Sequence, residues 1–407
     1  MNILIFSQYF WPESFRINEI AQDLHKAGES VSVLTGKPNY PGGVVFPGYT
    51  ALGTQSETFS GVTVHRVPLF PRGRGGGLRL FANYISFIFS ALLYGPILLR
   101  KEKIDIIFVY GISPLIQGLA ALPLKFFFKA KLVVWVQDLW PEDLASTGYI
   151  TSPALLKINE WPIKLLYQLT DRVLIQSESF RAPINRLMPQ KELHVLPNPA
   201  EREVFAQSSL AALPDALEFM KQGFNVVFAG NIGNNQSVET IVEAADILKD
   251  CAGLRILMIG SGSRSEYLQG EVQERNLQNL VVAGRYPTEA MSAIYAQSNA
   301  LLVSLAKKDN LSRTVPSKVQ TYMAAGKPII ASIDGEGARI IRESRAGLIC
   351  QAEDAHGLAE CIKELYAMTE TRRNEMGRMG RVYAEEHYHP SKVVQQLMSH
   401  FATVLEV

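Results

Sequence analysis

Cysteine is scarce in this chain of 407 residues. Its three cysteines, Cys251, Cys350 and Cys361, include no Cys-x-x-Cys pair, and none has a histidine at ligand spacing. A disulfide framework and a zinc site are therefore not expected, and the composition suits a reducing cytosol. No acidic cluster of the Asp-x-Asp kind lies at a predicted strand end, so no metal site is predicted.

The sequence also lacks the pattern of a signal peptide, a dinucleotide-binding fingerprint and a strong net charge. The apolar run at residues 3–6 follows no basic start and precedes no small-residue cleavage site, so we expect a first strand and not a signal peptide. The loop after this run lacks the glycines of a dinucleotide fingerprint, so a nicotinamide cofactor is not indicated. The net charge is only +1, which argues against nucleic acid as a partner, although residues 1–200 hold more basic than acidic residues.

Short apolar runs alternate with helical stretches along the whole chain. Strands are expected at residues 3–7, 31–35, 62–67, 105–110, 132–136, 172–176, 193–196, 225–230, 254–260, 279–284, 300–305 and 327–332. Such alternation is typical of βαβ units and parallel sheets. Two series in tandem predict an α/β protein with two doubly wound, Rossmann-like domains, residues 1–200 and 223–387. Ligands of such sheets bind beyond the carboxyl ends of the strands, so we expect the two domains to face each other across a cleft that holds the site.

One segment departs from this rhythm. Residues 78–101 are strongly apolar over about the length that spans a membrane. Asn83, two serines and the Gly95-Pro96 pair weaken that interpretation. Residues 122–131 and 161–169 add further apolar and basic patches. The basic residues around the first segment are Arg66, Arg72, Arg74, Arg79, Arg100, Lys101 and Lys103. This pattern favours contact with an anionic membrane surface, the alternative being a buried helix with a solvated basic collar.

The stretch at residues 314–330 combines phosphate-binding groups with a helix start. Pro316, Ser317 and Lys318 open the predicted helix, and Arg313 lies just upstream. Unpaired N–H groups and the helix dipole favour anions at such a place. The alternative is an ordinary helix–strand unit with a solvated lysine.

Three loops of the second half share a glycine- or arginine-rich pattern after a predicted strand. They are residues 228–236 with Gly230 and Gly233, residues 258–264 with Gly260, Gly262 and Arg264, and residues 281–287 with Arg285 and Tyr286. Backbone N–H groups in the first two can hold a diphosphate, Arg264 can pair with phosphate, and the third can lie against a nucleobase.

Loops of the first half carry polar and aromatic residues suited to a second substrate. Trp11 and Glu13 follow the first strand, the loop at residues 37–43 follows the second, and Asp138 follows the fifth. Asp138 can accept a hydrogen bond from a substrate hydroxyl or act as a base. Its alternative role is to cap the next helix.

Taken together, these motifs resemble the family 4 glycosyltransferases that build bacterial O-antigen, capsule and colanic acid. The motifs that carry this resemblance are YFWPE, PNYPGG, QDLWPE, VLPNP, FAGNIGNNQ, IGSGSR, AGRYP and PSKVQTYMAAGKPI. It implies a GT-B fold and sugar transfer with retained configuration, without a metal ion or other cofactor. It further implies a UDP-sugar donor on the C-terminal domain and a polyprenyl-diphosphate-linked acceptor at the cytoplasmic face of the inner membrane. The subgroup that transfers N-acetyl-L-fucosamine is the most similar, and in similar proteins the C-terminal segment, here 391–407, packs back on the first domain.

The chain departs from the family at several site positions. Arg313 and Thr321 stand where many members have two glutamates, and Asn231 and Gln236 replace the usual Arg and Lys. We therefore expect the phosphates to be held by Arg264, Arg313, Ser317 and Lys318. The predicted donor-binding set is Gly230, Asn231, Gly233, Gln236, Gly260, Gly262, Arg264, Arg285, Tyr286, Arg313, Pro316, Ser317, Lys318 and Thr321. The predicted acceptor-binding set is Trp11, Glu13, Asn39, Tyr40, Gly42, Gly43 and Asp138, and the predicted catalytic residues are Asp138, Lys318 and Arg264.

Two other functions remain open at this point. A GT-B scaffold also serves sugar-nucleotide epimerases, although a soluble epimerase has no use for the apolar patch. A non-enzymatic, membrane-docked scaffold is the other alternative, and binding of a nucleoside diphosphate discriminates against it.

Overall fold

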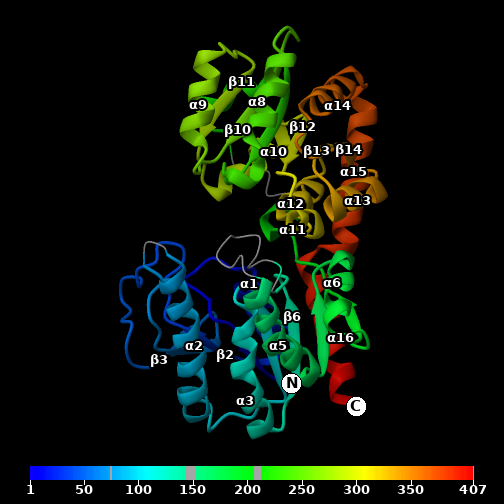
Figure 1. Cartoon of the computed structure of the whole chain (residues 1–407). Coiled ribbons are helices and arrows are strands. Elements are labelled where there is room, and N and C mark those ends of the chain that lie inside the picture. The colour runs from blue at the N-terminus through cyan, green and yellow to red at the C-terminus, as the bar shows by residue number, and fades with distance from the viewer. Residues whose placement is uncertain (74–75, 141, 143–152, 206–211, 407) are drawn as a thin grey trace. The chain divides into compact units, whose positions relative to one another are not determined.

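The computed structural model describes residues 1–73, 76–140, 142, 153–205 and 212–406. The chain divides into two compact units, coloured along the chain in Figure 1. The first unit comprises Met1–Pro197 and Val393–Val407, and the second comprises Asn198–Lys392. Arg74 of the basic flank and Pro141 of the QDLWPE motif lie outside the described residues.

The first unit is built on an eight-stranded sheet of order β3-β4-β2-β1-β5-β6-β7-β8. Its strands are β1 (Asn2–Phe6), β2 (Ser30–Gly36), β3 (Gln55–Phe59), β4 (Val62–Val67), β5 (Ile106–Gly111), β6 (Lys131–Val136), β7 (Arg172–Ile175) and β8 (Leu193–Val195). All neighbours pair in parallel except β3, which is antiparallel to β4. The apolar side chains of β1 are buried on both faces, because helices cover both sides of a parallel sheet.

Two hydrophobic cores lie on the two faces of this sheet. The helices of the unit are α1 (Arg16–Lys26), α2 (Gly77–Leu98), α3 (Ala121–Phe128), α5 (Pro153–Leu169), α6 (Arg181–Leu187) and α16 (Pro390–Glu406). Phe87 of α2 and Leu124 of α3 share one core with Phe6 of β1. Ile17 of α1 and Phe401 of α16 belong to the other core. The last helix of the chain therefore completes the first unit (Figure 1).

The second unit is built on a six-stranded parallel sheet of order β11-β10-β9-β12-β13-β14. Its strands are β9 (Phe224–Ala229), β10 (Leu254–Ile259), β11 (Leu280–Gly284), β12 (Ala300–Ser304), β13 (Ile329–Ser332) and β14 (Gly347–Cys350). Its helices are α7 (Arg202–Phe205), α8 (Val238–Ile247), α9 (Ser265–Glu274), α10 (Thr288–Gln297), α11 (Asp309–Arg313), α12 (Ser317–Ala324), α13 (Gly335–Ser344), α14 (Ala355–Ala367) and α15 (Glu370–His387). Val319 of α12 packs in one core, and Ile241 of α8 packs in the core on the opposite face. The strand order changes direction between β9 and β12, which is where open α/β sheets bind ligands.

The predicted α/β class with two doubly wound sheets is confirmed, and every predicted strand is present within one or two residues. Among the described strands, β3 and β14 were not predicted. β3 is a polar edge strand whose residues are all partly or fully exposed, so it lacks an apolar run. β14 has only four residues and follows directly on α13 and its left-handed cap at Arg345.

Candidate functional site

A pocket of about 790 Å³ lies in the second unit at the carboxyl ends of its strands. Its wall comes from the loops after β9, β10 and β11 and from the start of α12. Eleven of the predicted donor-binding residues line it: Gly230, Asn231, Gln236, Gly260, Gly262, Arg285, Tyr286, Pro316, Ser317, Lys318 and Thr321. Loops that are distant in the sequence thus converge on one cavity at the switch point of the sheet.

The loops after β9 and β10 pack backbone against backbone. Gly260 has φ +134°, and a Cβ built there would lie 1.8 Å from the carbonyl oxygen of Gly230. The N–H of Ile232 donates to the carbonyl of Ser261 at 3.0 Å. Any side chain at Gly260 would separate the two loops, so the glycine is needed for the shape of the pocket wall.

Lys318 is a buried cation in the lining of this pocket. It lies in the first turn of α12, where its Nζ donates to Gln236 Oε1 at 2.7 Å and lies 3.9 Å from the centroid of the Phe228 ring. Burial lowers the pKa of Lys318 to about 7. Within the described part of the chain, no carboxylate lies within 4 Å of this amine. A buried amine in the first turn of a helix, with no carboxylate within 4 Å in the described residues, is suited to an anionic ligand.

Two predicted phosphate ligands lie elsewhere. Arg264 pairs with Glu239, and its guanidinium lies 3.9 Å from the centroid of the Tyr267 ring. Arg313 Nη2 lies 2.7 Å from a carboxylate oxygen of Asp309, one helical turn earlier. Neither arginine lines the pocket, and Gly233 does not line it either.

The pocket also contains residues that the sequence analysis missed. Tyr322 is fully buried, and its Oη accepts from the N–H of Ala229 at 2.9 Å and donates to the carbonyl of the same residue. Tyr295 of α10 packs edge-on against Tyr322, and Glu201 adds a carboxylate to the lining. Tyr322 lies within the PSKVQTYMAAGKPI motif, but its contacts with Tyr295 and Ala229 could not be predicted, because these residues meet only after α10 and α12 pack on the sheet.

The predicted acceptor residues lie in the first unit. Buried Glu13 accepts the N–H groups of Asn39 and Tyr40 at 2.8 and 2.7 Å, and burial raises its pKa to about 7. Glu13 therefore fixes the loop at 37–43, whose Gly42 is exposed and whose Gly43 has φ +75°.

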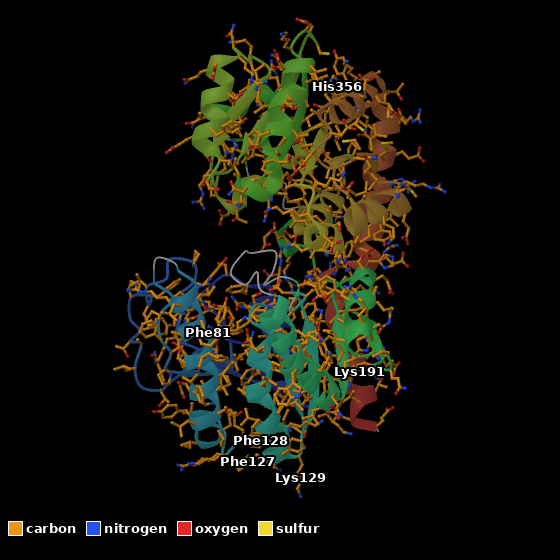
Figure 2. All side chains as sticks on the ribbon, viewed as in Figure 1. Phe81, Phe127, Phe128, Lys129, Lys191 and His356 are labelled. Atoms are coloured by element: carbon orange, nitrogen blue, oxygen red, sulfur yellow. The ribbon has the colours of Figure 1, made fainter. Side chains whose placement is uncertain are left out.

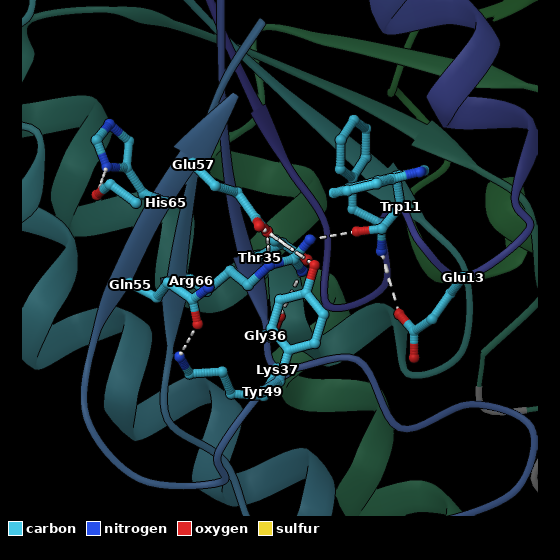
Figure 3. Close-up of polar contacts among 12 residues, drawn as sticks. Trp11, Glu13, Thr35, Gly36, Lys37, Tyr49, Gln55, Glu57, His65 and Arg66 are labelled. Carbon is cyan, nitrogen blue, oxygen red and sulfur yellow. Dashed lines mark hydrogen bonds and ion pairs between the residues drawn. The ribbon is translucent and has the colours of Figure 1, made fainter. Parts of the chain in front are cut away.

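Trp11 and Asp138 have separate surroundings. The Trp11 ring stacks on Phe59 at 5.0 Å, and its carbonyl accepts from Arg66 (Figure 3). Asp138 Oδ2 accepts the N–H of Ser113 at 2.6 Å, and burial raises the pKa of Asp138. Asp138 is thus held near the end of β6 but not by the loops that hold Glu13.

In the described residues, no group of three or more His, Cys, Asp and Glu side chains is placed to hold a metal ion. The polar groups that line the pocket are instead cations, amides, hydroxyls and backbone N–H groups, with Glu201 as the carboxylate. Such a wall can bind a phosphorylated ligand and stabilise negative charge on it.

Comparison with known proteins agrees with this chemistry. Residues 14–199 match the family described as glycosyl transferase 4-like domain, and residues 223–368 match glycosyl transferases group 1. A probable glycosyltransferase, WbjE, of Pseudomonas aeruginosa is 25% identical over 78% of this chain and 79% of its own. The putative colanic acid biosynthesis glycosyl transferase WcaI of Escherichia coli K12 is 24% identical over 89% of this chain and 88% of its own.

A solved structure shows the same fold. A UDP-forming α,α-trehalose-phosphate synthase of Burkholderia xenovorans superposes with a TM-score of 0.74, at 13% identity, over 99% of both chains. The two family matches together cover most of the chain and both of its units. The chain therefore belongs to the family 4 glycosyltransferases of GT-B fold.

Proposed function

We propose that this glycosyltransferase moves a sugar from a UDP-sugar to a polyprenyl-diphosphate-linked saccharide, with retained configuration and without a metal ion. N-acetyl-L-fucosamine is the candidate sugar, from the sequence resemblance. The observation that carries the proposal is the Lys318 amine, which lies in a glycine-walled pocket without a carboxylate partner within 4 Å in the described residues. The relative WcaI, by its name, takes part in colanic acid biosynthesis, and the trehalose-phosphate synthase is UDP-forming.

Leaving-group stabilisation is the main task in this reaction, because the nucleoside diphosphate departs with growing negative charge. Lys318 and the N–H groups at the start of α12 would supply it. Arg285 and Tyr286 would lie against the base and Thr321 near the ribose. Arg264 and Arg313 would have to leave Glu239 and Asp309 to join the phosphates. Asp138 would contact the acceptor hydroxyl, while the departing phosphate helps to remove its proton.

Binding of nucleotide tests the proposal directly. At about a hundredfold excess over Kd, UDP is expected to raise the unfolding midpoint of the second unit by about 5–10 °C, whether or not EDTA is present. GDP, CDP and dTDP serve as matched ligands. If EDTA abolishes the shift, metal independence is refuted, and if none of the nucleotides gives a shift, the scaffold alternative replaces the enzyme.

We further propose that the first unit binds the acceptor at the cytoplasmic face of the inner membrane. α2 is long and apolar enough to cross a membrane. Of the apolar 18-residue stretch that meets this criterion, 28% is buried in the protein. Its inner face carries Asn83, whose amide donates to the carbonyl of Phe70 at 2.6 Å and accepts from Gln8 at 2.7 Å. These buried hydrogen bonds support a helix that rests on lipid while it stays packed on its own sheet.

The outer face of α2 and the end of α3 supply the lipid-facing surface. The apolar side chains of α2 that are exposed are Leu78, Phe81, Phe89, Leu92, Leu93 and Ile97. Phe126 and Phe127 of α3 are 63% and 60% exposed, and Figure 2 shows Phe127, Phe128 and Lys129 together at the end of that helix. Aromatic rings beside a cation are typical of a surface that contacts anionic lipid.

Vesicle binding should therefore depend on both apolar and charged groups. We expect the protein to sediment with phosphatidylglycerol vesicles at low salt and to be released by high salt, since each basic residue contributes about 1 kcal/mol near such a surface. The double variant F89D/L93D should lose binding, whereas L52D, at a position that is 80% exposed outside α2 and α3, should keep it. Resistance to high salt and alkaline wash would indicate insertion instead.

A further inference from the structure

Three aromatic rings meet at the carboxyl edge of the first unit's sheet. Tyr9 follows β1, Phe15 caps α1, and Tyr40 follows β2. The ring centroids of Tyr9 and Phe15 are 5.4 Å apart, and those of Tyr40 lie 5.6 Å from Tyr9 and 5.3 Å from Phe15. Tyr9 is buried and Tyr40 is 38% exposed, so the Tyr40 ring is accessible to a ligand while it packs on a buried ring.

Arg72 lies beside these rings, and Arg79 lies against Gly73, the residue that follows Arg72. The guanidinium carbon of Arg72 lies 5.1 Å from the Tyr40 centroid and 5.8 Å from the Tyr9 centroid, and its Nη1 donates to Tyr9 Oη at 3.2 Å. Arg79, in the first turn of α2, reaches Gly73, where a Cβ would lie 2.6 Å from Arg79 Nη1. Within the described part of the chain, neither guanidinium has a carboxylate within 4 Å.

Arg72 and Arg79 thus place two positive charges on one short stretch of the chain, and neither has a carboxylate within 4 Å among the described residues. Two such charges suit an anion with more than one charge, and a guanidinium binds phosphate oxygens in a planar, two-pronged manner. The geometry therefore favours a phosphate-rich ligand over a single carboxylate.

The loops that carry these groups are tied together before any ligand arrives. Asn39 Oδ1 accepts the N–H of Arg72 at 3.2 Å and the side-chain amide of Asn83 at 3.3 Å. The N–H of Gly73 donates to the carbonyl of Gly43 at 2.8 Å. A Cβ at Gly43 would lie 1.8 Å from the Gly73 carbonyl oxygen, so only glycine allows this approach. Such cross-links lower the entropy cost of binding.

Arg72 and Arg79 lie close along the chain to the exposed apolar face of α2. Arg72 lies only a few residues before α2, so the two cations stand where the exposed apolar face of that helix begins, at Leu78 and Phe81 (Figure 2 labels Phe81). A polyprenyl diphosphate has the same order of groups: hydrocarbon, then two phosphates, then sugar. A site for it needs an apolar surface, then cations, then a ring on which a sugar can lie.

We propose that Arg72 and Arg79 bind the diphosphate of the lipid-linked acceptor and that the exposed Tyr40 ring lies under its first sugar. This inference rests on the proposed function, since it assigns the acceptor's anchoring site. It makes Arg72 and Arg79 positioning residues: they hold the diphosphate so that the acceptor sugar reaches the reaction centre.

The test uses phosphatidylcholine vesicles that contain either undecaprenyl diphosphate or phosphatidylglycerol at matched headgroup charge. The wild type should bind the diphosphate vesicles about tenfold or more tightly than the phosphatidylglycerol vesicles. R72Q and R79Q should each remove most of this preference. The matched control R100Q, an exposed arginine just beyond the other end of α2, should keep the preference while weakening binding to both vesicles equally.

The contrary results are equally distinct. If the wild type does not prefer the diphosphate, or if R72Q and R79Q keep the preference, or if all three variants lose it alike, the assignment is overturned and the arginines serve a general headgroup contact. R72K covers the case in which R72Q does not fold, and it should recover only part of the preference because a lysine lacks the planar fork. The assay contains no nucleotide, so a failure here is separate from a failure of UDP to stabilise the second unit.

Discussion

Replacement of Lys318 by methionine should lower the rate of sugar transfer by about a hundred- to a thousandfold, the loss seen when one preorganised donor to developing negative charge is removed. The protein should remain as stable as the wild type or become more stable. The buried amine already bears a desolvation cost, as its lowered pKa shows, and methionine keeps the apolar contact with Phe228. Steady-state kinetics and UDP-induced thermal shifts measure the two effects.

The control for this variant is K327M. Lys327 is also partly buried in the second unit, and burial lowers its pKa, but its Nζ donates to the carbonyl of Ala296 outside the main pocket. K327M should therefore keep near-normal UDP binding and transfer. A K318M protein that turns over and binds UDP like the wild type would remove Lys318 from the site.

The same lysine predicts how donor affinity depends on pH. A pKa of about 7 means that Lys318 is largely protonated below pH 7 and increasingly neutral above it. Because a bound diphosphate favours the charged form, affinity for a UDP-sugar should fall by up to about tenfold per pH unit above pH 7, until the pKa of the complex is reached. The slope should vanish in K318M, and titration calorimetry between pH 6 and pH 8.5 would show it.

The second large effect concerns stability. Arg66 of β4 is completely buried in the first unit, where it pairs with Glu57 and donates to the carbonyls of Gly36 and Trp11 (Figure 3). Its guanidinium also lies 4.9 Å from the centroid of the Tyr49 ring. Replacement by methionine would leave the Glu57 carboxylate and two carbonyl groups without this partner. We expect R66M to destabilise the first unit by about 3–5 kcal/mol.

Chemical denaturation followed with and without UDP would isolate this effect, because the ligand should shift only the transition of the second unit. R378M is the matched control: its partner Glu375 lies 3.9 Å away and both side chains are about two-thirds exposed. That variant should change stability by less than about 1 kcal/mol. A loss as small in R66M would mean that the buried pair contributes little beyond its own desolvation cost.

Much of the architecture could be predicted because strand patterns are local. Apolar runs such as that of β9 mark a strand buried on both faces wherever they occur. β3 could not be predicted in this way, because its pairing with β4 and not its own composition makes it a strand.

The lining of the candidate pocket was predictable to the extent that backbone shape decides it. Gly230, Gly260 and the start of α12 lie in the pocket because glycine loops and helix starts follow from local sequence. The ion-pair partners of the long arginine side chains were harder to predict. Arg313 pairs with Asp309 one turn before it in the structure, a spacing that favours an ion pair within the helix, and its predicted role at the phosphates stays a prediction. Arg264 pairs with Glu239 of α8. The two residues are far apart in the sequence, so no local spacing predicts this contact.

Because α16 belongs to the first unit, that unit is completed last during synthesis. The ribosome makes residues 198–392 before it makes Val393, so the first unit lacks its last helix until the whole second unit has been synthesised. Until then, Phe108 of β5 has no Phe401 ring to contact, and the part of the core that α16 covers remains open. A stop codon at Val393 would therefore damage the unit that was translated first, and leave the later unit with all its residues.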